Sequence, residues 1–328
     1  MMKRIRVGMM SFAHMHAGSY ASCLEKMPQV ELVGVADEDD ARGRAAAEAH
    51  NTDYYKSYDS LLKQNLDGVV ICSENYRHLE MTEMAAAAGA DILCEKPIST
   101  NADDARKMID LCRQAKVRLQ TAFPCRFSPA VAQVRDIVRE GRLGEIVAVK
   151  ATNRGRMPGG WFVDSRLSGG GAIIDHTVHV ADLLRWYTGA EAIEVYAEAG
   201  TMFNDIEAED AGLLTISYDN GIFATLDTSW SRPKSFPTWG DVYMEFTGTE
   251  GVAGVDAFIQ RLDHYSDENM SYGWAGWGSN TDMGLIRDWV DCLGSDREPS
   301  ITGEDGLRAL EVALAAYRSI ASGKPECV

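Results

Sequence analysis

The stretch Ile92-Leu93-Cys94-Glu95-Lys96-Pro97 joins a short apolar run to an acid, a base and a proline. Proline has no amide hydrogen, so it ends the hydrogen-bond ladder of a strand, and a Lys-Pro bond in a tight turn can be cis. The stretch therefore predicts a buried strand that holds Lys96 at its carboxyl end, where open α/β sheets bind ligands. A lone Lys-Pro pair is also typical of a surface loop, and the features below favour the first interpretation.

Similar apolar runs alternate with helical patterns through the first third of the chain. They cover residues 5–10, 30–37, 68–73, 90–95 and 117–122. A strand that is buried on both faces gives a continuous apolar run, whereas a half-buried strand alternates. We therefore predict an α/β Rossmann-type domain over residues 1–123, with a doubly wound parallel sheet.

The pattern changes after Arg126. A helical segment at 129–140 is followed by runs of alternating character at 146–153, 193–199, 211–218, 221–229 and 241–247. Asp219-Asn220-Gly221 between two of these runs is typical of a β-hairpin. We predict a second α+β domain over residues 124–328, with a large, mostly antiparallel open sheet, and a last helix at 306–321 that packs back on the first domain.

The composition limits the partners of the chain. Its 328 residues carry 32 basic and 49 acidic side chains, a net charge of −17, which disfavours nucleic acid and anionic membranes. No apolar run approaches the ~20 residues that span a bilayer. The seven cysteines are scattered and lack a CxxC pair, as expected for reduced thiols. We expect a cytoplasmic protein.

The first predicted strand leads into Gly8-Met9-Met10-Ser11-Phe12-Ala13. Against the dinucleotide motif G-x-G-x-x-G, only the first glycine is present, with Met10 at the second position and Ala13 at the tolerated third. If the turn binds a dinucleotide, the backbone amides of Ser11, Phe12, Ala13 and His14 face its pyrophosphate. An ordinary tight turn that binds nothing would give the same sequence, so the interpretation depends on the next feature.

Asp37 ends the second predicted strand, where an acid binds the adenosine ribose hydroxyls. An acid at this point disfavours a 2′-phosphate, so we predict NAD, with NADP possible because Arg42 and Arg44 follow closely. Polar residues also follow the third strand, over the same crevice, although each is also an ordinary loop or N-cap residue. They are Ser73, Asn75 and His78, the last of which either caps a helix or contacts substrate.

The second strong feature is a helix that three glycines, residues 169–171, precede and Gly189 ends. On it, Asp175, His179 and Asp182 are spaced i, i+4 and i+7 and form one polar stripe. A purely structural interpretation makes Asp175 a cap and His179 a core residue. Asp175, His176 and His179 also have the spacing of metal ligands, but the sequence offers no further ligand motif, and we predict no metal.

With these motifs the chain resembles, over essentially its whole length, the Gfo/Idh/MocA oxidoreductases, named for glucose-fructose oxidoreductase, inositol dehydrogenase and a rhizopine-catabolism protein. The resemblance rests on Cys94-Glu95-Lys96-Pro97, the glycine-led helix, and the segments at 126–129 and 248–251. It implies a two-domain enzyme that uses NAD or NADP on sugars, polyols or related compounds, and a homodimer or homotetramer built through the open sheet. Three residues depart from the family pattern: Met10, Glu74 and His176.

The resemblance makes Lys96, Asp175 and His179 the catalytic set and places Glu95 and Lys96 beside the cofactor. We expect hydride transfer between nicotinamide and a secondary alcohol, with His179 as the base and Lys96 stabilising the alkoxide. Asp175 would orient His179 or bind a neighbouring hydroxyl. Aromatic and guanidinium groups suit hydroxyl-rich or carboxylated ligands. The predicted substrate contacts are Arg126, Arg156, Trp161 and His176, with Arg166 and Trp230 as further candidates.

Two other functions remain open from the sequence. One is an enzyme that oxidises a glycoside transiently, eliminates, and recycles its NAD. The other is a sugar- or nucleotide-sensing regulator that has lost the reaction, although such a protein has no need of a base. The aromatic, glycine-rich segment 272–278 is interpreted as either a lid or a subunit contact.

Overall fold

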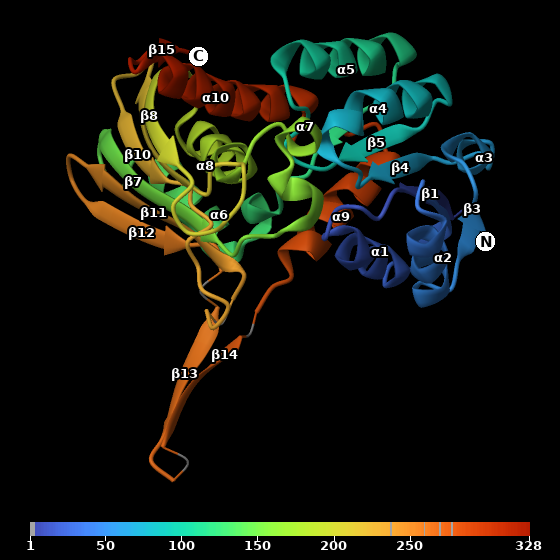
Figure 1. Ribbon diagram of the computed structural model, residues 1–328, viewed down its shortest axis with the longest axis horizontal. Helices are drawn as coiled ribbons and strands as arrows, with labels where there is room; N and C mark the ends of the chain where they lie inside the picture. The colour runs from blue at the N-terminus through green and yellow to red at the C-terminus, as the bar shows by residue number, and fades with distance from the viewer. Residues whose placement is uncertain (1–3, 237, 259, 269, 277) are drawn as a thin grey trace.

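The computed structural model describes residues 4–236, 238–258, 260–268, 270–276 and 278–328. Its first sheet has six parallel strands in the order β3-β2-β1-β4-β5-β6 (Figure 1). The strands are β1 (Ile5–Met10), β2 (Val30–Ala36), β3 (Asp53–Tyr55), β4 (Gly68–Ile71), β5 (Asp91–Cys94) and β6 (Leu119–Thr121). The predicted doubly wound parallel sheet is confirmed. Sequence reasoning missed β3, whose three residues are too short to show a periodic pattern.

Helices connect these strands. They are α1 (Ala17–Glu25), α2 (Asp40–Ala49), α3 (Tyr58–Leu62), α4 (His78–Ala87) and α5 (Ala102–Ala115). Side-chain caps fix three of their starts. The Asp39 carboxylate accepts from the amides of Ala41 and Arg42, Ser57 accepts from the amide of Ser60, and Asn101 accepts from the amide of Asp104. Since the strand order reverses between β1 and β4, the carboxyl ends of these strands open a crevice suited to a dinucleotide.

The second sheet has seven strands in the order β12-β11-β7-β10-β9-β8-β15. They are β7 (Ile146–Gly155), β8 (Ala192–Gly200), β9 (Ala211–Tyr218), β10 (Phe223–Asp227), β11 (Gly240–Gly248), β12 (Val252–Asp256) and β15 (Glu326–Cys327). β10 and β7 pair in parallel and the other neighbours pair antiparallel. The predicted hairpin turn at Asn220-Gly221 joins β9 to β10, and the predicted mostly antiparallel sheet is confirmed.

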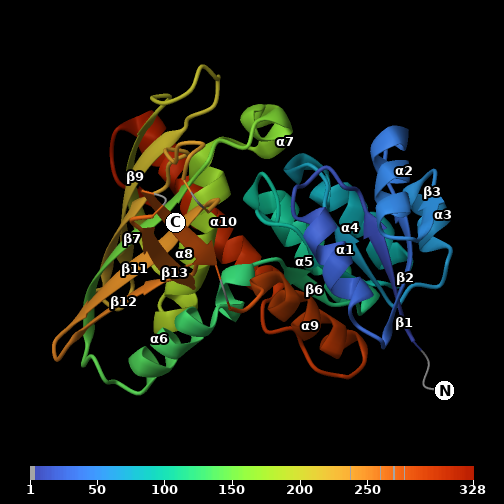
Figure 2. The same cartoon turned by 90° about the horizontal axis from the view of Figure 1, so that it is seen from below.

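Two long helices cover the inner face of the second sheet. α8 (Ala172–Thr188) and α10 (Gly303–Ser322) lie between the seven-stranded sheet and the first sheet (Figure 2). As predicted, α10 also reaches the first part of the chain, where Arg106 of α5 pairs with Glu311 at 2.5 Å. The remaining helices are α6 (Pro129–Arg139), α7 (Ser165–Ser168) and α9 (Thr281–Leu293).

The outer face of the second sheet is open. Side chains alternate along its strands, so every second residue points outward. Six large apolar side chains on these strands are more than a third exposed: Val147, Ile193, Tyr196, Leu213, Phe223 and Val252. The outer face of the second sheet therefore carries exposed apolar side chains on several of its strands.

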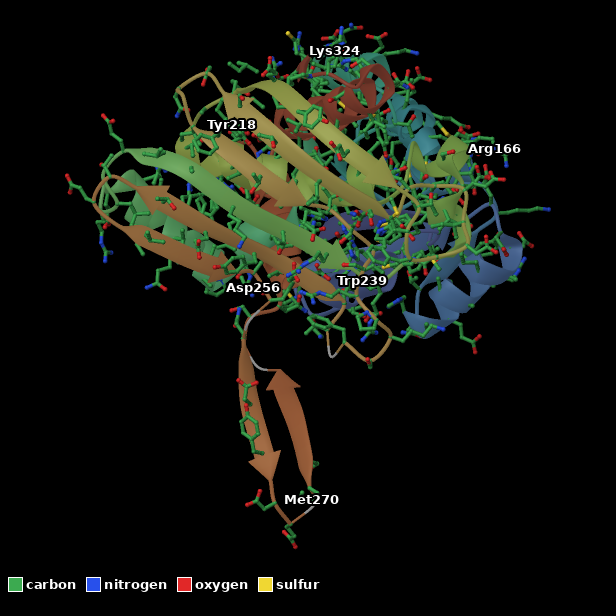
Figure 3. All side chains as sticks on the ribbon, turned by 60° about the vertical axis from the view of Figure 1, so that its left-hand side comes forward. Arg166, Tyr218, Trp239, Asp256, Met270 and Lys324 are labelled. Carbon is green, nitrogen blue, oxygen red and sulfur yellow. The ribbon has the colours of Figure 1, made fainter. Side chains whose placement is uncertain are left out.

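β13 (Arg261–Ser266) and β14 (Ser271–Gly276) form a separate two-stranded arm. The arm projects from the body, with Met270 at its tip, while Trp239 and Asp256 lie near its base (Figure 3). No helix among the described residues is long and apolar enough to cross a membrane.

Candidate active site

A pocket of about 230 Å³ lies where the first sheet meets α8 and the second sheet. Its polar and ionisable lining residues are His14, His16, Lys96, Cys125, Asn153, Asp175, His176, His179, Thr281 and Asp282. Its apolar lining residues are Met15, Pro124, Phe162, Trp239, Val242 and Phe258. The pocket thus combines groups that exchange protons with apolar walls that exclude water, as in a small-molecule site.

Lys96 follows β5, and its peptide bond to Pro97 is cis. Its ammonium Nζ lies 2.6 Å from Oδ1 of Asp175, near the start of α8. The indole Nε1 of Trp230 donates to Oδ2 of the same carboxylate at 3.1 Å. Burial acts to raise the pKa of Asp175, but the charge of Lys96 and these hydrogen bonds hold it well below its usual range. The pair is therefore a fixed, ionised couple.

His179 lies one turn further along α8 and also lines the pocket. Its Nδ1 is buried and has no hydrogen-bond partner among the described residues, and its ring packs edge-on against Phe123. Burial, followed by the charge of Lys96, lowers its pKa well below 6.5. The Asp175 oxygens contact Lys96, Trp230 and His176 rather than His179. His179 is thus a neutral imidazole able to accept a proton.

His176 shares the same wall of the pocket. Its Nε2 lies 3.3 Å from Oδ2 of Asp175, and burial lowers its pKa although Asp175 opposes the shift. A glycine is needed opposite it, because a Cβ on Gly155 would lie 2.8 Å from Cε1 of His176 and 3.0 Å from Nε1 of Trp239. The absent side chain at residue 155 therefore makes room for two lining residues.

A second couple adjoins the pocket, formed by the lining residues His14 and His16 with Glu95 behind them. His16 Nδ1 is 3.0 Å from Oε1 of the fully buried Glu95, and His14 Nδ1 is 3.5 Å from the same oxygen. Burial acts to lower the pKa of His16, but Glu95 raises it overall, whereas burial lowers that of His14 to about 3. Burial likewise acts to raise the pKa of Glu95, but the imidazoles hold it well below its usual range. The raised pKa of His16 thus favours an ion pair between His16 and Glu95.

Donor atoms of His14, His16 and Glu95 lie within 4.8 Å of one another, which also suits a metal ion. In the part of the chain that the structure describes, this is the one such group, so Asp175, His176 and His179 are not gathered in this way. The ion pair explains the short contact without a metal, and we assign none.

The turn after β1 is closed by hydrogen bonds within the protein. Ser11 has a φ of 72°, which gives the tight turn that glycine usually supplies. The four amides that were expected to face a pyrophosphate each have an acceptor inside the protein. For Ser11, Phe12, Ala13 and His14 the acceptors are Ala36 O at 2.7 Å, Asp37 Oδ2 at 2.6 Å, Ser11 Oγ at 3.1 Å and Cys72 O at 2.9 Å. Gly8 instead allows close packing, because a Cβ there would lie 2.7 Å from Leu66.

Asp37 lies just beyond the end of β2, at the predicted place, and is buried. Its carboxylate accepts from Arg42, through Nε at 2.9 Å and Nη2 at 2.7 Å. It also accepts from the amide of Phe12. The acid that was expected to bind the ribose is therefore already held by an arginine and by the first turn.

Three further predicted residues follow β4. Ser73 Oγ donates to the carbonyl of Glu74, and Asn75 Nδ2 donates to the carbonyl of Ser168 at 2.7 Å. His78 Nδ1 lies 3.0 Å from the Pro97 carbonyl. His78 therefore supports the loop that carries Lys96 and is not one of the residues that line the pocket.

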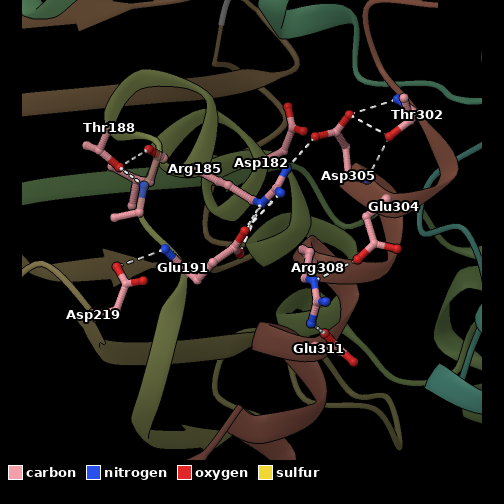
Figure 4. Close-up of polar contacts among 12 residues, drawn as sticks. Asp182, Arg185, Thr188, Glu191, Asp219, Thr302, Glu304, Asp305, Arg308 and Glu311 are labelled. Atoms are coloured by element: carbon pink, nitrogen blue, oxygen red, sulfur yellow. Dashed lines mark hydrogen bonds and ion pairs between the residues drawn. The ribbon is translucent and has the colours of Figure 1, made fainter.

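Arg126, a predicted substrate contact, is buried and lies behind the pocket. Its guanidinium donates to Asp182 at 2.8 Å and 2.5 Å, and lies 3.2 Å from Asp305. Burial raises the pKa of Asp182 to about 6, although Arg126 opposes the shift. Figure 4 shows the adjoining network, in which Arg185 joins α8 to Asp305 at 2.6 Å and to Glu191. Arg126 and Asp182 thus join α8 to α10. Of the polar stripe on α8, Asp175 and His179 line the pocket, whereas Asp182 belongs to this network.

The other predicted contacts also have structural partners. Arg156 donates to the carbonyl of Phe236, and the exposed Arg166 pairs with Asp164. Trp161 donates to the carbonyl of Ala13 at 3.0 Å and stacks on Phe162, so it links the second part of the chain to the first turn. Trp230 supports Asp175. Of the predicted substrate contacts, His176 is the one that lines the pocket.

The segment 272–278 falls on β14 and the residues after it, and Trp277 lies outside the described residues. The arm points away from the body (Figure 1). Its two ends nevertheless reach the site, because Phe258 before β13 and Thr281 after β14 line the pocket.

Sequence reasoning missed several lining residues. His16 could have been found from its spacing, since His14-Met15-His16 precedes α1. Asp282 and Asn153 carry no motif, and long-range packing alone brings them to the pocket.

A parallel six-stranded sheet with a crevice at its strand ends, joined to an open-sheet domain with ionisable groups at the junction, is typical of dinucleotide-dependent oxidoreductases. Comparison with known proteins identifies the family. Residues 5–123 match the model of the oxidoreductase family with an NAD-binding Rossmann fold, and residues 131–253 match that of the GFO/IDH/MocA C-terminal domain. The chain belongs to the Gfo/Idh/MocA oxidoreductases, and the predicted family and NAD-binding fold are confirmed.

Named relatives and a solved structure are similar to this chain over most of its length. Inositol 2-dehydrogenase of Rhizobium meliloti (strain 1021) is 29% identical over 315 residues, which cover 92% of this chain and 93% of that protein. D-xylose 1-dehydrogenase [NADP(+)] of Haloarcula marismortui is 25% identical, with coverage of 82% and 77%. The crystal structure of GenD2 from gentamicin A biosynthesis, in complex with NAD, superposes with a TM-score of 0.91 at 25% identity and covers 100% of this chain and 97% of its own.

Proposed function

We propose that this protein is an NAD-dependent dehydrogenase that oxidises a secondary alcohol of a sugar, polyol or cyclitol to a ketone. The observation that carries the proposal is the convergence of Lys96, Asp175 and His179 on one pocket at the carboxyl end of β5. The names of its relatives, which include inositol 2-dehydrogenase and D-xylose 1-dehydrogenase [NADP(+)], support this substrate class.

In this proposal His179 removes the hydroxyl proton. Its neutral, buried imidazole is in the accepting form at neutral pH, and base catalysis of this kind is typically worth ~10²–10⁴-fold. The ammonium of Lys96 lies beside the same space and stabilises the negative charge that develops on the substrate oxygen. Asp175 fixes the ammonium and, through His176, the neighbouring wall of the pocket.

NAD, when bound, supplies the hydride acceptor. The residues present fit a dinucleotide, since the strand order places a crevice above β1 and β4, and the orphaned, buried Nε2 of His14 lies next to the pocket. We propose that the cofactor lies along Gly8, the turn at 11–14 and Asp37, and reaches Ser73, Asn75, Glu95 and Lys96. His14 Nε2 offers a donor in addition to the engaged amides of the turn.

We further propose that the chain assembles as a homodimer or homotetramer through the open sheet. The six exposed apolar side chains on its outer face support this, because apolar patches of this kind favour association. The molar mass of the purified assembly in solution tests this proposal. Leu213→Glu, at a position that is 64% exposed on β9, should shift the molar mass toward that of one chain. Met202→Glu, in the neighbouring loop, serves as a matched control.

The test of function is NADH formation from a panel of cyclitols, pentoses and hexoses, with Lys96→Met as the inactive control. We expect NADH to accumulate with at least one neutral polyhydroxylated compound. A product that forms only when NAD is present, without net NADH, would indicate the NAD-recycling reaction instead. Calorimetric binding of NAD without turnover on any compound would argue for a regulator.

A further inference from the structure

The cations that line the pocket already have carboxylate partners. Two cations contribute to it, Lys96 and His16. Each is already matched by a buried carboxylate, Asp175 at 2.6 Å and Glu95 at 3.0 Å. The imidazoles of His14, His176 and His179 are neutral at neutral pH because burial lowers the pKa of each.

The arginines near the pocket lie outside its lining, since none is among the described residues that line it. Arg126 pairs with Asp182 and Asp305, and both Arg154 and Arg232 pair with Asp241. Arg156 donates to a backbone carbonyl. A carboxylated substrate would therefore meet, among the described lining residues, only cations that already have a carboxylate partner.

Asp282 is the remaining charge. It lies in the first turn of α9, next to the end of the arm, and lines the pocket. Ser19 Oγ donates to its Oδ2 at 2.5 Å and holds the carboxylate in place. No lysine, arginine or histidine in the described part of the chain forms an ion pair with it, although His16 is near enough for Asp282 to raise its pKa. Asp282 is thus a lining carboxylate without a cation of its own among the described residues, whereas Lys96 and His16 are each held by another carboxylate.

We propose that Asp282 determines substrate specificity, by favouring a polyhydroxylated substrate that carries a protonated amine and rejecting one that carries a carboxylate. This inference rests on the proposed dehydrogenase function. An ammonium group can donate a charge-assisted hydrogen bond to the carboxylate, whereas a hydroxyl donates a neutral one and a second carboxylate repels it.

The oxidised nicotinamide ring is also a cation, and Asp282 could serve the cofactor instead. The two roles differ in what is lost on mutation. If Asp282 contacts a substrate amine, Asp282→Asn changes the selectivity among substrates and leaves NAD binding intact. If it serves the nicotinamide, the same change lowers kcat/KM equally for all substrates.

The experiment compares kcat/KM for a neutral hexose, the matching amino hexose and the matching hexuronic acid, at saturating NAD and neutral pH. The variant is Asp282→Asn, which keeps the size of the side chain. The matched control is Asp291→Asn, an exposed position on the same helix. NAD affinity is measured in parallel by calorimetry.

We expect wild type and Asp291→Asn to prefer the amino hexose over the neutral hexose by about tenfold and to use the acid poorly, and Asp282→Asn to lose the preference. Equal use of the amino and neutral hexoses by wild type would overturn the inference while leaving the dehydrogenase proposal in place. Equal loss on all substrates in Asp282→Asn would overturn it in favour of the cofactor role. Failure of wild type on every compound would count against the proposed function itself.

Discussion

Lys96 and Asp175 form a 2.6 Å ion pair that joins the two sheets, because Lys96 follows β5 of the first and Asp175 lies on the helix that covers the second. The site therefore exists only when the two parts of the chain are packed together. Each residue is nearly buried, so neither charge is well solvated without the other.

Replacing Lys96 by methionine should lower kcat by ~10²–10³-fold, because the developing alkoxide loses its cation. The variant also leaves Asp175 buried without its ion-pair partner, a change that typically costs ~3–5 kcal/mol of stability. NAD affinity should be retained. Steady-state kinetics, thermal unfolding and NAD titration measure the three effects, with the exposed Lys107→Met on α5 as control. Turnover at the wild-type rate would exclude Lys96 from the chemistry.

His179→Asn should lower kcat by ~10²–10⁴-fold and remove the acid limb of the pH profile. In wild type, the acid limb should fall well below pH 6.5, because burial and Lys96 depress the pKa of His179. Unfolding restores a pKa near 6.5, so the unfolded chain binds the extra proton first and this residue makes stability fall as pH decreases below that value. An acid limb that is identical in the variant would assign the base to another group.

Asp37→Ser should shift the cofactor preference toward NADP. The change removes the carboxylate that repels a 2′-phosphate and frees the guanidinium of Arg42 from its two hydrogen bonds. We expect the ratio of NAD to NADP affinity to fall by about tenfold or more. Asp40→Ser, three residues further on and exposed, is the control. An unchanged ratio would mean that Asp37 only supports the Phe12 turn.

Arg126→Met should destabilise the protein by ~3–5 kcal/mol, because it leaves Asp182 buried without its main cation. The substrate KM of the folded variant should be unchanged, since Arg126 lies behind the pocket. Denaturant unfolding and kinetics at low temperature separate the two effects. A large rise in KM with little loss of stability would restore the substrate role that the sequence predicted.

The parts of the fold that the sequence predicts are those with a repeated local signal. Continuous apolar runs predict β1, β2, β4, β5 and β6, and the glycines that flank α8 predict both of its ends. β3 and the arm were missed as elements, because three residues of strand and an aromatic, glycine-rich ribbon carry no clear periodicity.

The site was predictable to the extent that its residues belong to motifs. Lys96, Asp175, His176 and His179 do, and the structure brings them to one pocket. Arg126 shows the limit of such reasoning, because a guanidinium suits a buried carboxylate as well as a substrate, and the partners Asp182 and Asp305 lie 56 and 179 positions away in the chain. Asp282 reaches the pocket only through the packing of α9, which no local pattern encodes.

The proton-handling groups and the other lining residues of the pocket come from different parts of the fold. The proton-handling groups project from α8, which Arg126 and Arg185 fasten to Asp305 on α10, whereas Phe258, Thr281 and Asp282 come from the connections at the base of the arm. A library that randomises those connections would therefore vary what the pocket accepts while the reactive geometry stays fixed. The architecture makes this chain a practical starting point for engineering new alcohol specificities.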